Sequence, residues 1–353
     1  MSRAYVKMIP MRRAVVLLTI FLFCSFSFRG FAASTTHYEI HADSSLQDIS
    51  LQDDAFHGRG RRPFIEWWYF DAKFENDYTV TFGIQVVEMI AFDIVTVRLT
   101  IYNQGEVILK KIEKSSLNEF VASSSVPCVA IGGQQLIVGS YEKDTDRFIY
   151  NVTYESSEGS ISLQFIGYMN GWKRQQQAGD WWAVIFPRAD VTGTISIGST
   201  KMQVTGTGYH DHNWHVRPHI VLNYGWLWGT CHSSTYTVTW AEICRTRMTT
   251  YPQMVINGKD GTVLDIPSET IWFSQKDTHI DHLRLIPWFF NIETMTEKVF
   301  LVINMKVVAV DYTELLGFIS YWRYHIQCSG TIVLNGHMET VEGISIMEYL
   351  RFR

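Results

Sequence analysis

The side chains best suited to chemistry in this sequence lie in one run, 209–214, which combines phenol, imidazole, carboxyl, amide and indole groups. If this run forms a strand, its side chains alternate between two faces. Tyr209, Asp211 and Asn213 then share one face. The remaining side chains of the run share the opposite face: His210, His212 and Trp214. A carboxyl group among aromatic rings loses hydration, which raises its pKa and keeps it protonated near neutral pH. Asp211 is therefore the candidate general acid.

A buried, protonated carboxyl group suits the hydration or cyclisation of an alkene. Such a reaction requires an acid that protonates carbon, a dry pocket that shelters the cation, and one admitted water. Ring faces at Trp182, Tyr209 and Trp214 would stabilise the cation by roughly 0.5 to 2 kcal/mol each. His212 would position or deprotonate the water. This chemistry requires no metal and no cofactor.

Further acidic and aromatic residues recur in the runs 66–71, 180–182 and 226–229 and in the candidate strand 235–243. We expect their side chains, with two from the run 209–214, to bind the substrate: Glu66, Trp68, Asp180, His210, Trp214, Trp228, Trp240 and Glu242. Glu66 and Glu242 each share a strand face with tryptophan, so both are secondary acid candidates. The alternative is structural, because tryptophan and tyrosine with polar neighbours also line barrel interiors.

Two other interpretations of the run 209–214 stay open. Its polar groups could form a buried, hydrogen-bonded corner that fastens one barrel to the other, since buried polar groups must find partners. Alternatively, His210 and His212 could bind a metal ion together with His215 or His219. We expect no metal site, because a loop can intervene between these histidines.

Composition narrows the class of ligand. Aromatic residues make up 14% of the 353 residues and charged residues only 18%, which favours an apolar small molecule, such as a lipid, as the ligand. The net charge of -5 and the absence of a Lys/Arg stripe argue against nucleic acid as a partner. Peripheral association with a membrane is a further expectation for a protein that handles such ligands.

Alternating runs rich in β-branched and aromatic residues predict an all-β fold. The clearest candidate strands are 78–87, 96–102, 147–154, 160–166, 235–243, 299–312, 319–328 and 343–349. Turn signals between runs, such as 103–105 and Asn335-Gly336, predict hairpins. Many short hairpin-linked strands are typical of barrels and sandwiches.

Four motifs in order resemble the carotenoid 1,2-hydratase (hydroxyneurosporene synthase) and AttH-like family: EWWYFDA at 66–72, a second cluster at 180–182 followed by a proline-containing stretch, GTGYHDHNW at 206–214 and WLWG at 226–229. The resemblance covers about residues 60–245. It implies two lipocalin-like (calycin) antiparallel β-barrels in tandem and work on long isoprenoid or other apolar molecules. Asp211 and Tyr209 match the acid and phenol of the family motif, and Trp182 matches an aromatic of its second cluster. The chain departs from the family pattern at Asp180, where a His is expected, and at His215, where Gly is usual.

Two functions follow as hypotheses. The first is a hydratase or cyclase that acts on an alkene of an apolar isoprenoid by protonation and water capture. The second is an exported carrier that binds apolar ligands without changing them, as many lipocalin-like proteins do.

The sequence also predicts an amino-terminal export signal and two domains. Residues 1–33 resemble a signal peptide, with a basic region, an apolar run that Arg29 interrupts, and small residues before the expected cleavage site. We expect export to the periplasm or the exterior, or anchoring if the signal is not cleaved. The two barrels are predicted at 34–200 and 201–353. Four cysteines remain after the signal and allow three disulfide pairings: Cys128, Cys231, Cys244 and Cys328.

Overall fold

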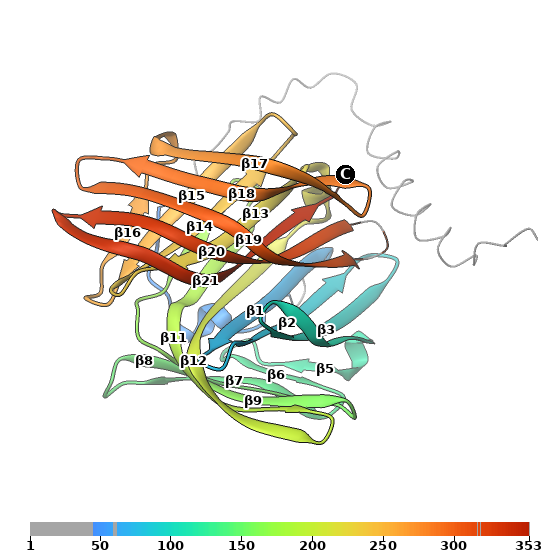
Figure 1. Cartoon of the computed structure of the whole chain (residues 1–353). Helices are drawn as coiled ribbons and strands as arrows, with labels where there is room; N and C mark the ends of the chain where they lie inside the picture. Colours follow the sequence, from blue (N-terminus) through green and yellow to red (C-terminus); the bar gives the residue numbers. More distant parts are fainter. Residues whose placement is uncertain (1–44, 59–61, 316, 318, 353) are drawn as a thin grey trace, which may run out of the picture. The chain divides into compact units, whose positions relative to one another are not determined.

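A computed structural model describes residues 45–58, 62–315, 317 and 319–352. These residues belong to one compact unit built mainly of antiparallel strands (Figure 1). The predicted signal peptide, 1–33, lies outside them. None of the helices in the described part of the chain has the length and apolar character that a membrane crossing requires.

The first sheet has 12 strands in the order β4-β3-β2-β1-β12-β11-β9-β8-β7-β6-β5, with β10 paired to β11. Its strands are β1 (Phe64–Phe74), β2 (Tyr78–Glu88), β3 (Asp93–Asn103), β4 (Glu106–Ser115), β5 (Phe120–Ala122), β6 (Cys128–Ile131), β7 (Gln134–Glu142), β8 (Arg147–Glu155), β9 (Gly159–Gly167), β10 (Trp172–Gln175), β11 (Trp181–Ile197) and β12 (Thr200–Val216). Two short 3-10 helices accompany this sheet, η1 (Leu51–Asp54) and η2 (Leu117–Glu119).

The second sheet has 9 strands in the order β16-β15-β14-β13-β21-β20-β19-β18-β17. Its strands are β13 (Gly225–His232), β14 (Tyr236–Cys244), β15 (Thr250–Gly258), β16 (Val263–Ile266), β17 (Ile271–Asp281), β18 (Arg284–Met295), β19 (Val299–Leu315), β20 (Ile319–Leu334) and β21 (His337–Arg351). The 3-10 helix η3 (Pro218–Leu222) connects the two sheets, and η4 (Ser268–Thr270) precedes β17.

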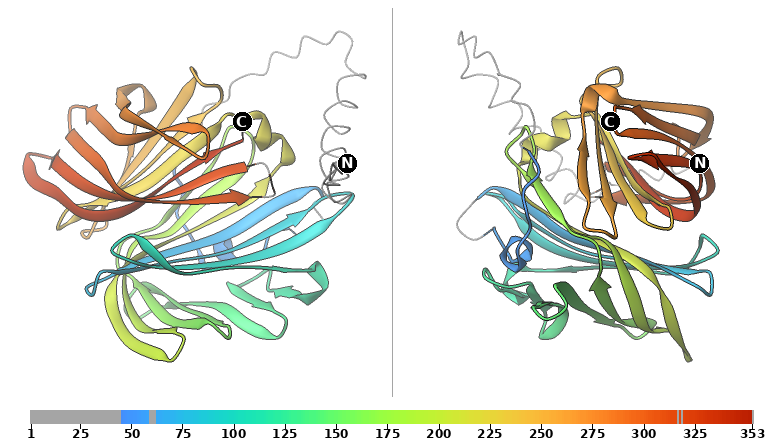
Figure 2. Two further views of the ribbon diagram at one scale, coloured as in Figure 1. Left: turned by 45° about the vertical axis from the view of Figure 1, so that its right-hand side comes forward. Right: turned by 90° about the vertical axis from the view of Figure 1, so that its left-hand side faces the viewer.

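Each sheet curls around its own apolar core (Figure 2). One of the two sheets forms a nearly closed barrel and the other a half-barrel. Strand alternation builds these cores: on β1, Phe70, Ala72 and Phe74 point into the first core. The all-β, antiparallel architecture predicted from the sequence is therefore confirmed.

Each of the eight predicted strand ranges overlaps a strand, and the predicted turns form hairpins. Gln104 and Gly105, between β3 and β4, have φ values of 51° and 84°, the left-handed conformation that a tight hairpin turn requires. Asn335 and Gly336, between β20 and β21, repeat this geometry with φ values of 51° and 83°.

The chain passes from the first sheet to the second between Val216 and Gly225. Residue 200, where the sequence suggested the start of a second barrel, begins β12 in the first sheet. The sequence suggested a boundary there because glycines punctuate the stretch 193–208. Gly198 lies in the β11–β12 turn with a φ of 56°, and the other glycines of the stretch lie within the two strands. That each sheet folds as a separate domain stays a prediction.

The four cysteines after the signal are free thiols in the structure. Cys231, Cys244 and Cys328 are buried, and Cys128 is half-buried. The structure therefore does not distinguish between the three disulfide pairings that the sequence allows.

Candidate active site

Asp211 lies on β12, opposite Tyr69 of β1 on one side and Val184 of β11 on the other. Its Oδ2 accepts hydrogen bonds from the Tyr209 hydroxyl at 2.9 Å and from Trp182 Nε1 at 3.1 Å. The residue is only 5% exposed. Burial raises the pKa of Asp211 to about 8, although the bonds from Tyr209 and Trp182 work in the opposite direction. The carboxyl group is therefore protonated near neutral pH.

Because Oδ2 already accepts two hydrogen bonds, the proton of Asp211 belongs on Oδ1. Oδ1 lies 3.3 Å from the side-chain amide of Asn213. An amide nitrogen and oxygen are interchangeable in such an assignment, so Asn213 can turn its carbonyl oxygen toward the protonated Oδ1. Asn213 is thus the natural acceptor for the acid proton.

Aromatic side chains from both sheets surround this acid and form what we call the inter-sheet cluster. Its buried members are Trp172, Trp182, Val184 and Tyr209 from the first sheet, and Trp228, Ala241 and Val255 from the second. The ring centroids of Tyr209 and Trp228 are 4.9 Å apart, as are those of Trp172 and Trp182. The donors that hold Asp211 therefore belong to an apolar layer between the sheets.

A buried cation lies close to this cluster. Arg323 of β20 donates from Nη1 to the Tyr69 hydroxyl at 2.9 Å and pairs with Glu348 of β21 at 3.3 Å. The Tyr69 hydroxyl in turn lies 3.1 Å from Oδ2 of Asp71. Burial raises the pKa of Asp71, which the cations Lys73 and Arg323 oppose. Sequence reasoning missed Arg323 and Glu348, although a charged residue within the apolar strand 319–328 was a detectable signal.

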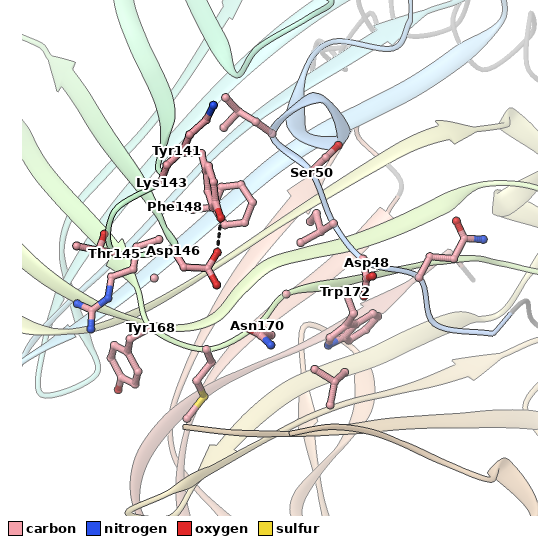
Figure 3. A pocket seen from close by; sticks show the side chains of 18 of the residues that line it. Asp48, Ser50, Tyr141, Lys143, Thr145, Asp146, Phe148, Tyr168, Asn170 and Trp172 are labelled. Atoms are coloured by element: carbon pink, nitrogen blue, oxygen red, sulfur yellow. Dashed lines mark hydrogen bonds between the residues drawn. The ribbon is translucent and has the colours of Figure 1, made fainter. Parts of the chain in front are cut away.

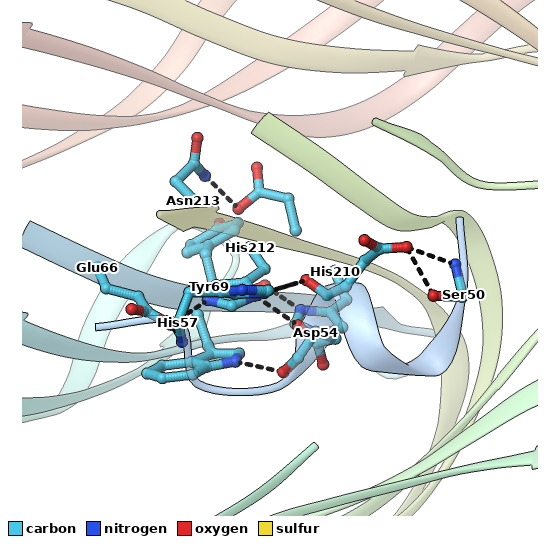
Figure 4. A network of polar contacts seen from close by, with 11 residues as sticks. Ser50, Asp54, His57, Glu66, Tyr69, His210, His212 and Asn213 are labelled. Atoms are coloured by element: carbon cyan, nitrogen blue, oxygen red, sulfur yellow. Dashed lines mark hydrogen bonds and ion pairs between the residues drawn. The ribbon is translucent and has the colours of Figure 1, made fainter. Parts of the chain in front are cut away.

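His210 and His212 lie on the opposite face of β12 from Asp211 and stack on the core residues Phe70 and Trp68. Their rings point toward Asp54 and Glu66 (Figure 4). His210 Nδ1 lies 2.9 Å from the Tyr69 carbonyl oxygen, and its Nε2 lies 3.0 Å from Oδ2 of Asp54. Both ring nitrogens therefore face oxygen acceptors, so a proton must lie between His210 and Asp54. This pair anchors η1 to the barrel wall.

His212 makes the second anchor. Its Nδ1 lies 3.1 Å from the Asp53 carbonyl oxygen, and its Nε2 lies 3.0 Å from Oε1 of Glu66. Burial lowers the pKa of His212 to about 4 and raises the pKa of Glu66 to about 8. The two groups are therefore a neutral pair near neutral pH, with the Glu66 proton donated to Nε2.

The structure brings together Asp211, Tyr209, Trp182 and Trp228, all predicted from the sequence. It does not bring His212 to Asp211, because neighbouring positions of a strand point to opposite faces. The predicted role of His212 as the partner of the reacting water therefore has no geometric support in this arrangement.

The other predicted binding residues lie in three separate places. Trp68 and Trp214 are inside the first barrel, where Trp68 stacks on His212 with centroids 4.5 Å apart. Trp240 is in the apolar core of the second sheet, and Glu242 lies on the same face of β14, where burial raises the pKa of Glu242 to about 7. Asp180 precedes β11 and is half-buried.

A pocket of about 1130 Å³ adjoins the inter-sheet cluster (Figure 3). Its walls come from the segment 46–51, the β7–β8 hairpin and the β9–β10 connection, and their aromatic rings are Tyr141, Phe148, Tyr168 and Trp172. Leu46 and Trp172 belong both to this lining and to the inter-sheet cluster or its apolar surroundings. Asp211 is not a lining residue, and Trp172 and Trp182 stand between it and the pocket.

Among the described residues, no group of three or more His, Cys, Asp or Glu side chains is arranged to hold a metal ion. His215 and His219, the proposed additional ligands, lie near the end of β12 and in η3.

No protein-family model matches the chain, and no curated protein matches its sequence. Solved structures do match. An AttH-type protein of Nitrosomonas europaea is 13% identical with a TM-score of 0.61, covering 90% of this chain and 98% of the other. Kievitone hydratase of Nectria haematococca is 11% identical with a TM-score of 0.56, covering 91% and 96%. CghA, solved with Sch210972, is 11% identical with a TM-score of 0.51, covering 82% and 88%.

At these identities the likeness shows the fold. The chain has the lipocalin-like fold of the AttH-type protein, of kievitone hydratase and of CghA. The resemblance that the sequence phrases indicated is thus confirmed in three dimensions.

Proposed function

We propose that this protein is a hydratase or cyclase that protonates an alkene of a small, apolar, isoprenoid-like substrate, with Asp211 as the general acid. One observation carries the proposal: a buried carboxyl group, whose pKa burial raises to about 8, is held by a phenol and an indole between two sheets. The match to a hydratase structure supports it through the shared fold.

The geometry suggests how the acid works. The proton leaves Oδ1 of Asp211 for an alkene carbon, and the new C–H bond leaves a carbocation on the neighbouring carbon. Tyr209 and Trp182 already donate to Oδ2, so they stabilise the carboxylate that forms. The rings of Tyr209 and Trp228, with centroids 4.9 Å apart, are the aromatic groups that would shelter the cation.

Two outcomes are open to the cation. A water molecule forms the new C–O bond and returns a proton to Asp211, which completes hydration. Alternatively, a second alkene of the substrate forms a C–C bond, and loss of a proton to Asp211 completes cyclisation. Asp211 is restored in both cases, so the reaction does not depend on His212.

A carrier function is the second candidate, and the pocket favours it. Its volume of about 1130 Å³ and its four aromatic rings are sufficient for a ligand of substantial size, while Asp211 lies outside its lining. In a carrier, Asp211 and Tyr209 would fasten the two sheets together and would not contact the ligand.

Product analysis separates these functions. The purified protein is incubated with acyclic carotenoids and shorter isoprenoids, and mass spectrometry follows the gain of one water or the formation of an isomer. We expect Asp211→Asn to lower turnover by roughly a hundredfold or more. Asp190→Asn, the same change at an exposed position of β11, is the matched control and should retain activity.

Each result has a defined meaning. Equal product formation by the native protein and Asp211→Asn would show that the acid assignment is wrong. Recovery of an unchanged bound ligand, with equal affinity in both proteins, would establish the carrier instead.

We further propose that the protein is exported through residues 1–33. Amino-terminal sequencing of the protein from an expressing cell tests this proposal. A mature start soon after residue 33 in the periplasm or medium would support it, and an intact start in the cytosol would contradict it.

A further inference from the structure

One end of the two sheets carries the most exposed large apolar side chains of the described residues. The strand register places the β2–β3 loop, the β14–β15 loop and the β17–β18 hairpin at this end, which we call the apolar rim (Figure 2). The short η3 connection from β12 to β13 joins the ends of the two sheets here. Leu283 is 96% exposed, Met248 92%, Ile280 76% and Ile90 70%.

Isolated exposed apolar residues are normal on protein surfaces. The rim differs from such isolated residues because its exposed apolar side chains lie in three loops at the same end of the sheets. Leu283 lies in the turn of the β17–β18 hairpin, and Ile280 pairs across it with Leu285, which is 55% exposed. The hairpin is held in place, because Trp322 Nε1 donates to Asp281 at 2.7 Å and His282 stacks on Tyr312 at 3.8 Å. Its apolar side chains are therefore presented by an ordered support.

Positive charge gathers on one part of the rim, around η3 and the β14–β15 loop, whereas Glu88, Asp93, Asp281 and Glu314 lie on its other loops and strand ends. Exposed or half-exposed arginines on its loops and strand ends are Arg62, Arg217, Arg245, Arg247 and Arg284. The loop 245–249 and the segment 217–222 contain no acidic residue. Arg217, Arg245 and Arg247 therefore form a positive patch beside Met248 in a chain whose net charge is -5.

The opposite end of the second sheet provides a contrast. It also exposes large apolar side chains, with Met338 75%, Met295 65% and Trp272 57% exposed. Its charged neighbours are mainly acidic: Glu269, Glu293, Glu297, Glu339 and Glu342, with Lys298 as a cation. The two ends therefore match in apolar exposure and differ in charge.

We propose that the apolar rim docks on the surface of an anionic lipid membrane. Apolar loop tips enter the boundary between headgroups and acyl chains, while neighbouring arginines bind anionic headgroups. The acidic end lacks the second component and stays in water. This proposal does not depend on the assignment of Asp211, although a membrane is the natural source of an apolar substrate.

Vesicle binding tests the proposal with the full chain. Vesicles of phosphatidylcholine are compared with vesicles containing one part phosphatidylglycerol to two parts phosphatidylcholine, by flotation at low and high salt. We expect binding to the anionic vesicles that weakens with salt. Met248→Glu with Leu283→Glu should lower affinity at least tenfold, and Arg247→Gln roughly fivefold. Met295→Glu with Met338→Glu, at the acidic end, is the matched control.

A second measurement locates the contact and is insensitive to any binding by residues 1–33. A tryptophan is placed at Leu283 or at Met338, and quenching by brominated phospholipids is measured above the native background. We expect additional quenching from Leu283→Trp and none from Met338→Trp. Equal quenching at both ends, or equal affinity of the rim variant and the control, would overturn the proposal. A dimer that Leu283→Glu dissociates, without vesicle binding, would assign the rim to a second copy instead.

Discussion

The neutral pair of Glu66 and His212 predicts how stability depends on pH. Glu66 is fully buried, and its Oε1 meets His212 Nε2 at 3.0 Å and accepts from the His57 amide at 2.9 Å. Burial raises the pKa of Glu66 from 4.5 to about 8. Its folded pKa exceeds the unfolded value, so its contribution to stability is complete below 4.5 and is lost as pH rises toward 8.

The size of this effect follows from linkage. Between the two pKa values the loss is about 1.4 kcal/mol per pH unit, or about 3 kcal/mol from about pH 5 to about pH 7.5. Glu66→Gln removes the titration. Its amide cannot both donate to His212 and accept from His57 through one atom, which adds a pH-independent penalty of about 1 kcal/mol. The variant should therefore gain stability relative to the native protein as pH rises.

Urea unfolding at a series of pH values and constant ionic strength measures this difference. Glu155→Gln, at an exposed position, is the matched control and should show no trend. The lowered pKa of His212 has the opposite effect on stability, because the folded protein becomes less stable as pH falls from 6.5 toward 4. The native protein and both variants all contain His212, so this effect is common to the three measurements. A difference between Glu66→Gln and the native protein that stays constant with pH would refute a protonated Glu66.

Two further predictions concern the space between the sheets. Trp182→Phe removes a hydrogen bond that favours the charged form of Asp211, so the pKa of Asp211 should rise further. The pH above which activity falls should rise with this pKa. A downward shift of that limit in a pH-rate profile would contradict the prediction. Arg323→Met removes the buried cation that pairs with Glu348, whose side chain is 17% exposed, and should cost about 3 kcal/mol in urea unfolding. Arg323→Met combined with Glu348→Leu should recover part of this loss, and a loss below about 1 kcal/mol for Arg323→Met would show that the pair contributes little to stability.

The sequence could predict the fold class and much of the site because these features depend on local patterns. Alternation along β12 is enough to place Tyr209 and Asp211 on one face and His212 on the other. The same alternation explains why His212 cannot assist Asp211. The turn at Gly105 could also be predicted from local sequence, because the adjacent residues Gln104 and Gly105 indicate the left-handed conformation of a hairpin turn.

Features that depend on distant parts of the chain could not be predicted in this way. Arg323 reaches Tyr69 only because β20 of one sheet faces β1 of the other, a pairing that no local pattern encodes. Asp54 meets His210 across a long sequence separation, from a short helix without a strong signal. The passage between the sheets, from Val216 to Gly225, carries no glycine-rich signal, whereas the glycine-punctuated stretch around residue 200 forms a hairpin.

The protonation state of Asp211 is the central claim, and a site-specific titration measures it most directly. Carbon-13 labelled aspartate, with Asp211→Asn to assign the signal, reports the ionisation of this carboxyl group alone. We predict a protonated carboxyl group at neutral pH that titrates with a midpoint of about 8. A midpoint near the ordinary value of 3.8 would mean that Asp211 is a carboxylate at neutral pH and cannot act as the acid.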